Sequence, residues 1–359
     1  MKRPFALIGI TYLSVQAALF YLESDLAAAI LTAVCFIGTI VSLFILKNRN
    51  LRHTVLCFCL TAAFASTIFS GYNIFVKQPI VDKYSEREIY VTATVLEQPT
   101  VQYDTYRYLI ETDSINGKIE KLKICLSTIN ELNVEEFDRI SCVLPLKECT
   151  KSQMIADGAF LQASVNKNFA YIVKKTDDKP LYYQAVKIRE NFADSFEQNM
   201  SQDCASLCRA VLLGEKTALS QEIQNDFTRC GVSFLIVVSG MHLAIISSFV
   251  FLCIKKIIKN RVLRSMIMLM CAFSFMAVTG FAPSVVRAGV MLAVVYSGKM
   301  FMRKGDSLNS LGIAALILTV PNPTAVADVG MLLSFTATLG IILWARKISV
   351  YIMGKFAKL

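Results

Sequence analysis

Eight apolar stretches dominate the sequence and constrain what the chain can fold into. Most of them are long enough to cross the roughly 30 Å hydrocarbon core of a bilayer as a helix, and the shorter ones are expected to tilt or break. With 55% hydrophobic and only 18% charged residues, the composition is far more apolar than that of a soluble domain. We therefore predict a polytopic α-helical membrane protein, with spans at residues 5–22, 26–46, 54–76, 231–254, 266–280, 284–302, 307–320 and 330–345.

Basic residues gather at the ends of these stretches and predict their orientation. The chain carries a net charge of +10, and its densest basic loop holds Lys255, Lys256, Lys259, Arg261 and Arg264. Cytoplasmic loops of membrane proteins are enriched in Lys and Arg. The pattern predicts a multi-pass protein of the cytoplasmic membrane, with both termini in the cytoplasm, residues 77–230 outside, and the lipid bilayer as a partner.

Between the third and fourth apolar stretches the sequence changes to short alternating segments. Residues 89–98 alternate at a period of two, and Asn116-Gly117 is a hairpin signal because both positions tolerate a positive φ. We predict an inserted extracytoplasmic small β-barrel, the OB-fold being one such architecture. Its other expected strands cover residues 106–112, 119–126, 139–146 and 169–174.

An amphipathic helix is expected after the barrel, at residues 181–200. Ile188, Phe192, Phe196 and Met200 follow one another at i+4, a stripe that suits either the outer membrane interface or packing on the barrel. Polar helices follow, with Cys204 and Cys208 one turn apart and not bonded. The expected domains are thus N-terminal transmembrane helices (1–78), the OB-like domain (79–180), amphipathic helices (181–230) and a second transmembrane region (231–359).

Three tyrosines of the barrel region, Tyr103, Tyr106 and Tyr108, raise the question of nucleic-acid binding. Aromatic residues of OB barrels stack on the bases of single strands over a basic groove. Residues 79–180, however, carry 13 Lys/Arg against 16 Asp/Glu, a net charge of −3 that does not favour phosphate. We favour the alternative that these tyrosines are ordinary strand and surface residues.

Three cysteines of the same region, Cys125, Cys142 and Cys149, are candidates for a disulfide. The predicted location outside the membrane allows a disulfide to persist. A bond from Cys125 to either of the other two fits adjacent strands, and buried free thiols fit equally well.

The fourth apolar stretch contains Ser239, Gly240 and His242 near its middle, a costly set of groups at membrane depth. Ser and His form nucleophile–base dyads in hydrolases, but here they lie three residues apart on one predicted helix. Val237 also stands two positions before Ser239, so the sequence lacks a GxSG motif. We predict that the chain is not an enzyme. Two interpretations stay open for these residues, a close helix–helix contact and a polar lining of an aqueous path.

Arg287 poses a similar choice near the predicted outer interface. It either snorkels to the headgroups or supplies a fixed positive charge that faces a pore and attracts an anion such as phosphate. Ser284 and Asp328 stand at expected helix starts, where each is a candidate N-cap.

Metal chemistry is not expected. The sequence has two histidines, His53 and His242, in different segments, and its eleven cysteines form no CxxC pair. A zinc site cannot be assembled from these residues, so we predict no metal and no cofactor.

Three segments of the chain resemble the ComEC family of DNA-internalisation (competence) membrane proteins: LLGEKTALSQEIQNDFTRCGVSFLIVVSGMHLAII, then GFAPSVVRAGVML, then ADVGMLLSFTATLGI. The order of N-terminal spans, OB-like domain and interfacial helix also looks alike, so the resemblance covers nearly the whole chain. The matching positions are Gly231, Ser239, Gly240, His242, Gly280, Ser284, Arg287, Ala288, Gly330, Ser334 and Phe335.

The resemblance implies a bacterial membrane channel component that passes single-stranded DNA inward during natural transformation. Its implied pore or motif residues are Ser239, Gly240, His242, Ser284, Arg287 and Ser334.

Two positions depart from the family pattern, since Phe234 and Leu332 stand where its members usually have His and Gln. Larger members continue beyond the position of Leu359 with more helices and a metallo-β-lactamase-like domain, so we expect no nuclease activity here. The alternative is a non-conducting membrane scaffold, or a vestigial or split remnant of such a transporter. A separate chain that supplies the missing parts, or a homo-oligomer, would then be a partner.

Overall fold

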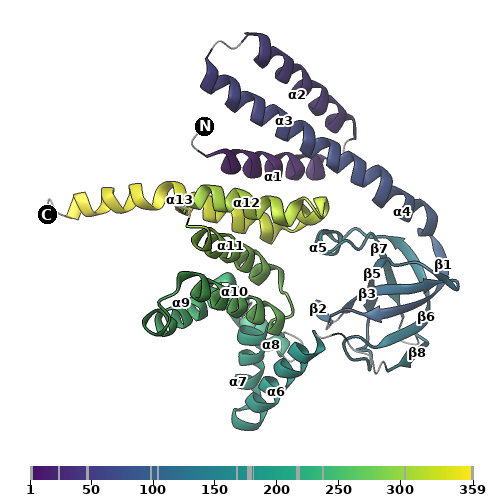
Figure 1. The fold of residues 1–359 in the computed structure, drawn as a ribbon. Coiled ribbons are helices and arrows are strands. Elements are labelled where there is room, and N and C mark those ends of the chain that lie inside the picture. Colours follow the sequence, from purple (N-terminus) through teal and green to yellow (C-terminus); the bar gives the residue numbers. More distant parts are fainter. Residues whose placement is uncertain are drawn as a thin grey trace. The chain divides into compact units, whose positions relative to one another are not determined.

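Helices and one small β-barrel make up the chain in a computed structural model (Figure 1). The structure describes residues 3–22, 25–45, 48–97, 99–102, 105–166, 169–175, 180, 182–215, 219–236, 238–302 and 305–356. The chain divides into two units. Unit 1 comprises Met1–Val76, Ile258–Met266 and Val290–Leu359, and unit 2 comprises Lys77–Ile257 and Ile267–Gly289.

Unit 1 is helical, and its first helix packs on helices from both ends of the chain. α1 (Pro4–Leu22) lies against α3 (Arg49–Tyr72) and against α12 (Ser307–Thr319). α1 and α12 cross at Gly9 and Gly312, where a Cβ on Gly9 would lie 2.1 Å from the carbonyl oxygen of Gly312. Such a close approach of two backbones requires glycine on both helices. The remaining helices that lie wholly in unit 1 are α2 (Asp25–Ile45), η4 (Pro323–Ala327) and α13 (Val329–Phe356).

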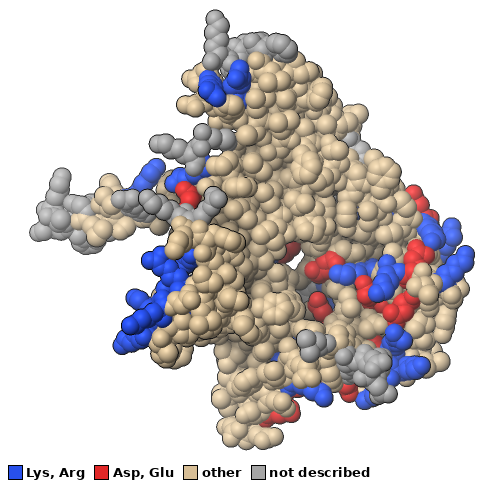
Figure 2. Space-filling view, viewed as in Figure 1, with Lys and Arg blue, Asp and Glu red and all other residues tan. Residues whose placement is uncertain are grey.

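Five helices among the described residues are long and apolar enough to cross a membrane, compared with the eight spans predicted. They are Pro4–Leu22, Arg49–Tyr84, Gly240–Ile257, Arg261–Val278 and Val329–Tyr351. Two further predicted spans appear as the shorter apolar helices Ala28–Leu43 and Ser307–Thr319. In Figure 2 charged side chains gather over the barrel, whereas the surface of the unit 1 helices is mostly uncharged. These features are compatible with a helical membrane protein.

The third predicted span continues well beyond residue 76. α3 runs into a π-helical segment, η1 (Asn73–Lys77), and then into α4 (Gln78–Tyr84), which gives a helix of 36 residues. Asn48 caps its start, since its side chain accepts the backbone N–H of Asn50 at 3.1 Å. The helix therefore carries the chain directly to the first strand of the barrel at Arg87.

The barrel is a ring of five strands in unit 2. β1 pairs with both β3 and β6, and β7 pairs with both β5 and β6, so the order β1-β3-β5-β7-β6 closes on itself. β5 and β7 run parallel and the other pairs antiparallel, which is compatible with an OB-like barrel. The ring strands are β1 (Arg87–Val95), β3 (Thr105–Ile115), β5 (Lys123–Thr128), β6 (Arg139–Glu148) and β7 (Leu161–Val165), with β2 (Thr100–Gln102), β4 (Lys118–Ile119) and β8 (Tyr171–Lys174) added at its margins.

Local sequence signals explain part of this barrel. Asn116 and Gly117 form the predicted turn between β3 and β4, with φ values of 48° and 79°. Alternate residues of each strand fill the interior, as in Ile89, Val91 and Ala93 of β1. β7 and the short helix α5 (Ser152–Ala156) were not predicted from the sequence.

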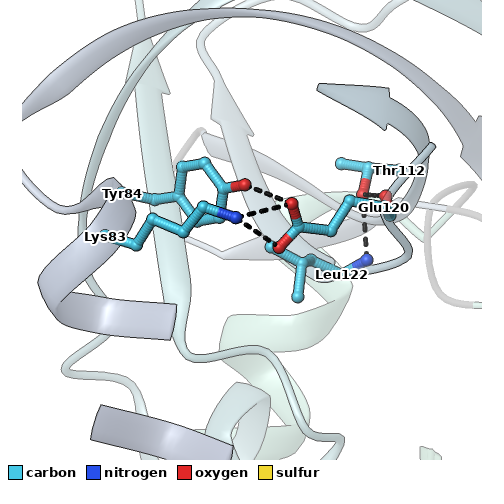
Figure 3. A network of polar contacts seen from close by, with 5 residues as sticks. All are labelled: Lys83, Tyr84, Thr112, Glu120 and Leu122. Atoms are coloured by element: carbon cyan, nitrogen blue, oxygen red, sulfur yellow. Dashed lines mark hydrogen bonds and ion pairs between the residues drawn. The ribbon is translucent and has the colours of Figure 1, made fainter. Parts of the chain in front are cut away.

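A hydrogen-bonded cluster fastens the end of α4 to the barrel (Figure 3). Lys83 Nζ donates to both carboxylate oxygens of Glu120, at 2.8 and 3.1 Å, and the Tyr84 hydroxyl donates to the same carboxylate. Thr112 Oγ1 donates to the Glu120 carbonyl at 2.6 Å and accepts the N–H of Leu122 at 2.9 Å. The hydrogen bond from Lys83 holds the pKa of Glu120 below its ordinary value.

We expect acid to loosen this cluster. A carboxyl whose pKa is lowered by folding stabilises the protein above its unfolded-state pKa, and the contribution is lost as the pH falls through the folded-state value. Deuterium exchange at the Leu122 amide, corrected for intrinsic rate, should therefore accelerate in acid. Glu120→Gln should show the faster exchange already at pH 7, and Glu88→Gln, at an exposed carboxylate of β1, should not. An acid-independent exchange rate in the wild type would contradict this role.

The last helix differs from its prediction at one end and agrees at the other. α13 runs through Arg346 and Lys347 to Phe356, whereas the predicted span ended at residue 345. At its start the Gly330 N–H donates to Asp328 Oδ1 at 2.9 Å, which confirms Asp328 as the cap.

Candidate functional site

The helix predicted at residues 231–254 is broken. A 3-10 turn, η3 (Ser233–Ile236), precedes the break, and α9 (Gly240–Ile257) begins after it. Ser239 therefore lies at the entry to α9, where its backbone N–H donates to His242 Nδ1 at 3.1 Å and its Oγ lies 3.1 Å from the same nitrogen. An Nδ1 that accepts the backbone N–H leaves the ring proton on Nε2. The pair thus closes the first turn of α9.

α11 (Pro283–Met300) begins against this entry. Ser284 Oγ donates to the carbonyl oxygen of Val238 at 2.6 Å, so Ser284 satisfies a carbonyl before α9 and does not cap its own helix as predicted. A Cβ on Gly240 would lie 2.8 Å from the Cβ of Ala288. The predicted close helix contact at Gly240 is therefore present, and it joins the starts of α9 and α11.

Arg287 lies one turn into α11, and its side chain is buried with 9% of its surface exposed. A snorkelling Arg would extend toward solvent or headgroups, whereas this side chain packs within unit 2. The first turns of α9 and α11 contain no acidic residue. Two helix N-termini and a buried guanidinium thus give this part of unit 2 a positive character.

A second cluster, here called the joint, connects the barrel to the turn between α10 (Arg261–Val278) and α11. Arg189 of α6 (Tyr183–Asn199) forms an ion pair with Glu136 of the β5–β6 loop, and both side chains are less than a tenth exposed. A Cβ on Gly280 would lie 2.8 Å from Arg189 Nη1, and the φ of Gly280 is +68°. Burial raises the pKa of Glu136, and the guanidinium of Arg189 opposes that rise. The turn fits against the ion pair because residue 280 is glycine.

Aromatic rings continue the joint. The ring of Tyr182 lies 5.8 Å from that of Phe137 in the barrel loop and 5.3 Å from that of Phe281 in the α10–α11 turn. Phe137 and Phe281 have φ values of 70° and 51°, an unusual left-handed backbone for bulky residues. Two strained positions are therefore held against one tyrosine. The only residue of the joint that the sequence analysis singled out was Gly280, the first residue of the segment GFAPSVVRAGVML.

α6 presents its apolar stripe outward. The helix buries Arg189 together with Val186 and Ala193, while Ile188 and Phe192 are about half exposed. It therefore packs through a face that includes Arg189 of the predicted polar side, while Glu190, Asp194 and Glu197 of that side are exposed. An exposed apolar stripe of this kind is typical of a helix at a membrane interface.

The structure does not support base stacking by the barrel tyrosines. Tyr108 is buried in the barrel core and its hydroxyl accepts the Leu132 N–H at 2.8 Å, which agrees with the favoured interpretation of an ordinary strand residue. Tyr106 is partly buried against the same core, and Tyr103 lies outside the described residues. A cavity of about 220 Å³ beside Tyr108 is acidic, a poor setting for phosphate. Its charged lining residues are Glu97, Glu131, Glu135, Glu136, Glu190, Arg209 and Glu215.

The disulfides considered for the barrel do not fit its strand order. Cys142 lies in the barrel interior, whereas Cys125 and Cys149 lie in a separate cluster on the other face. Cys149 follows the end of β6, and β7 lies between β5 and β6, so Cys125 and Cys149 are not on neighbouring strands. All three are buried free thiols, and burial raises the pKa of Cys142 to about 12.

The remaining motif positions lie elsewhere. Ser334 is half-buried on α13 of unit 1, and its carbonyl accepts Thr338 Oγ1 at 2.8 Å, whereas Ser239 and Arg287 belong to unit 2. Leu332 and Phe335 pack into the core of unit 1. Phe234 belongs to η3, and its side chain lies outside the described residues.

Comparison with known proteins assigns the broken-helix region to a family. A family model described as competence protein matches residues 211–358, which contain η3, α9, α10 and α11. ComE operon protein 3 of Bacillus subtilis (strain 168) is 20% identical over 325 residues, covering 88% of this chain and 41% of the relative. The chain thus spans about two fifths of that relative's length. No solved structure matches the chain significantly. The family model covers the broken-helix region and the relative matches nearly the whole chain, and together the two matches support a ComEC-family protein.

Proposed function

We propose that this chain is a membrane channel component for the uptake of single-stranded DNA across the bacterial cytoplasmic membrane in natural transformation. The observation that carries the proposal is the break before α9, inside the segment that the competence model matches. In membrane proteins, non-helical backbone at membrane depth is tolerated where it lines a cavity or is buried in protein. Discontinuous helices there often direct their N-termini at anionic groups.

The residues around the break would attract DNA electrostatically and would not make or break covalent bonds in it. The N-termini of α9 and α11 carry partial positive charge, and the guanidinium of Arg287 adds a full one. His242 keeps a donor at Nε2 while its Nδ1 accepts from Ser239. The contact of Gly240 with Ala288 holds the two helix starts together, so that this field is fixed in place. We assign no catalytic role to Ser239 and His242.

We also propose that both termini are cytoplasmic and that residues 77–230 lie outside. The basic loop that contains Lys255 and Lys256 then faces the cytoplasm, where DNA leaves. The exposed apolar stripe of α6 would lie in the outer interface, and the acidic barrel would position the helices without binding DNA. A separate chain or a second copy would supply further helices around the path.

Transformation of cells that carry altered copies of the gene tests the proposal. Deletion of the gene should abolish transformation, and Arg287→Gln should lower it by about tenfold or more, because a charge-assisted contact contributes about 1.5–3 kcal/mol. His242→Ala should lower it as well. Lys299→Gln removes a positive charge from the exposed end of the same helix and should have little effect. Immunoblots of membranes ensure that the variants are compared at equal protein levels.

Normal transformation in the deletion strain would refute the proposal. The second candidate, a non-conducting scaffold or remnant, is favoured by Leu332, which packs against an apolar core where the family usually has Gln. It predicts that Arg287→Gln and His242→Ala leave transformation unchanged.

A further inference from the structure

Three sulfur-bearing side chains gather where α6 gives way to α7 (Gln202–Cys208). Cys208 Sγ lies 3.8 Å from Met200 Sδ. Cys204 precedes Cys208 by one helical turn, which places their Cβ atoms on one face about 6 Å apart. Met200 and Cys204 are exposed and Cys208 is half-buried, so the group is open to solutes.

The chain brings this group together by ending a helix. Residues eight apart in a continuous helix are separated by about 12 Å along its axis. At Met200 the backbone is instead extended, with φ −131° and ψ 162°, and α7 starts anew after Ser201. The bend returns the thioether of Met200 to the thiol of Cys208. Directly after Cys208 the helix widens into a π segment, η2 (Arg209–Leu213), a feature frequent at functional sites.

The geometry points to a binding site for the cuprous ion, Cu(I), on Met200, Cys204 and Cys208. Thiolate and thioether sulfurs are soft ligands that select Cu(I). Two sulfurs that each lie about 2.3 Å from a metal in a trigonal arrangement are about 4 Å apart, close to the separation already present between Met200 and Cys208. Among the described residues, no group of three or more His, Cys, Asp and Glu is placed to hold a metal, so the harder donor sets that suit zinc or calcium are not offered.

Binding requires proton release and no electron transfer. Each cysteine loses its thiol proton to the solvent as its sulfur bonds to Cu(I), and the neutral thioether of Met200 supplies the third ligand. The complex then carries one net negative charge. Arg209, the residue after Cys208, forms ion pairs with the carboxylates of Glu197 and Glu215. This inference does not depend on the proposed role in DNA uptake.

Competition with a chromophoric chelator tests the site. The full chain, purified in detergent and kept reduced without oxygen, is titrated into Cu(I)–bicinchoninate, and the loss of absorbance reports transfer of the metal. We expect one Cu(I) per chain to be taken up. Cys204→Ser and Cys208→Ser should each abolish this uptake, and Met200→Leu should weaken it without abolishing it. Cys230→Ser, at an exposed thiol outside the group, is the matched control and should bind as the wild type does.

Two outcomes would overturn the inference. The first is a wild-type chain that removes no Cu(I) from the chelator. The second is uptake that persists in Cys204→Ser and Cys208→Ser, because the metal would then reside on other thiols. Circular dichroism of the metal-free variants shows whether lost binding comes from lost ligands or from a lost fold. Met200→Leu keeps both thiols, so it measures separately how much the thioether contributes to Cu(I) affinity.

Discussion

Replacing Arg189 by leucine is expected to destabilise the protein by about 3–5 kcal/mol, because it leaves a buried carboxylate without its counter-charge. Glu136 and Arg189 are each less than a tenth exposed, so water cannot replace the missing partner. The loss should shrink as the pH falls, since protonation of Glu136 removes the buried charge. The effect is measured by thermal unfolding of the purified protein in detergent. Protease cleavage of the β5–β6 loop is the readout of unfolding.

The double variant provides the decisive comparison for this ion pair. Leucine at both positions removes both charges, so Arg189→Leu with Glu136→Leu should recover much of the stability lost in either single variant. The neighbouring pair of Lys175 and Glu135 is exposed, and Lys175→Leu should change stability little. A double variant as unstable as the single variants would show that the charge pairing is not the source of the effect.

The second large effect is expected at the crossing of α1 and α12. A Cβ on Gly312 would lie 2.1 Å from the carbonyl oxygen of Phe5 and 2.9 Å from the Cα of Ala6, so backbone rather than a flexible side chain must move. Gly312→Ala should cost about 3 kcal/mol or more, the upper range for overpacked cores. The expected result is a lower amount of protein in membranes and faster proteolysis near α1.

A matched substitution separates this clash from the general effect of adding a methyl group to a helix. Gly298 lies on α11 with open space around its Cβ position, and Gly298→Ala should leave protein levels unchanged or slightly raised. Equal levels for Gly312→Ala and the wild type would mean that the two helices do not cross this closely.

The elements that the sequence predicted depend on local chemistry. Asn116-Gly117 turns because both residues accept a positive φ, and Asp328 caps α13 because its carboxylate reaches a backbone N–H two residues on. The apolar stretches predicted that helices form, which is also a local property, but they did not predict the residue at which each helix ends. β7 was missed because its five residues carry a weak pattern and pair in parallel with β5, which is distant in the sequence.

The sequence identified the residues of the candidate site but did not predict how they are arranged. Ser239, Gly240, His242, Ser284 and Arg287 were singled out, but the break before Gly240 was not, because apolar residues continue through it. A Ser directly before an apolar helix is a start signal, and this signal was available at Ser239.

The joint escaped prediction for a different reason. The amphipathic pattern of α6 places Arg189 toward water, and the rule behind that expectation assumes that the medium outside the protein is water. Here Arg189 is buried instead, through a partner in the barrel loop that no local pattern reveals, while the other charged residues of that side stay exposed.

The joint also sets an order of assembly. Its barrel side, Glu136 with Arg189, is complete once α6 has been made, whereas Gly280 and Phe281 are synthesised only after α9 and α10. Segments nearer the N-terminus generally fold first during synthesis. The barrel and α6 can thus act as a finished template that receives the α10–α11 turn and holds its left-handed backbone. The starts of α9 and α11 would then inherit their spacing from a domain completed before either helix left the ribosome.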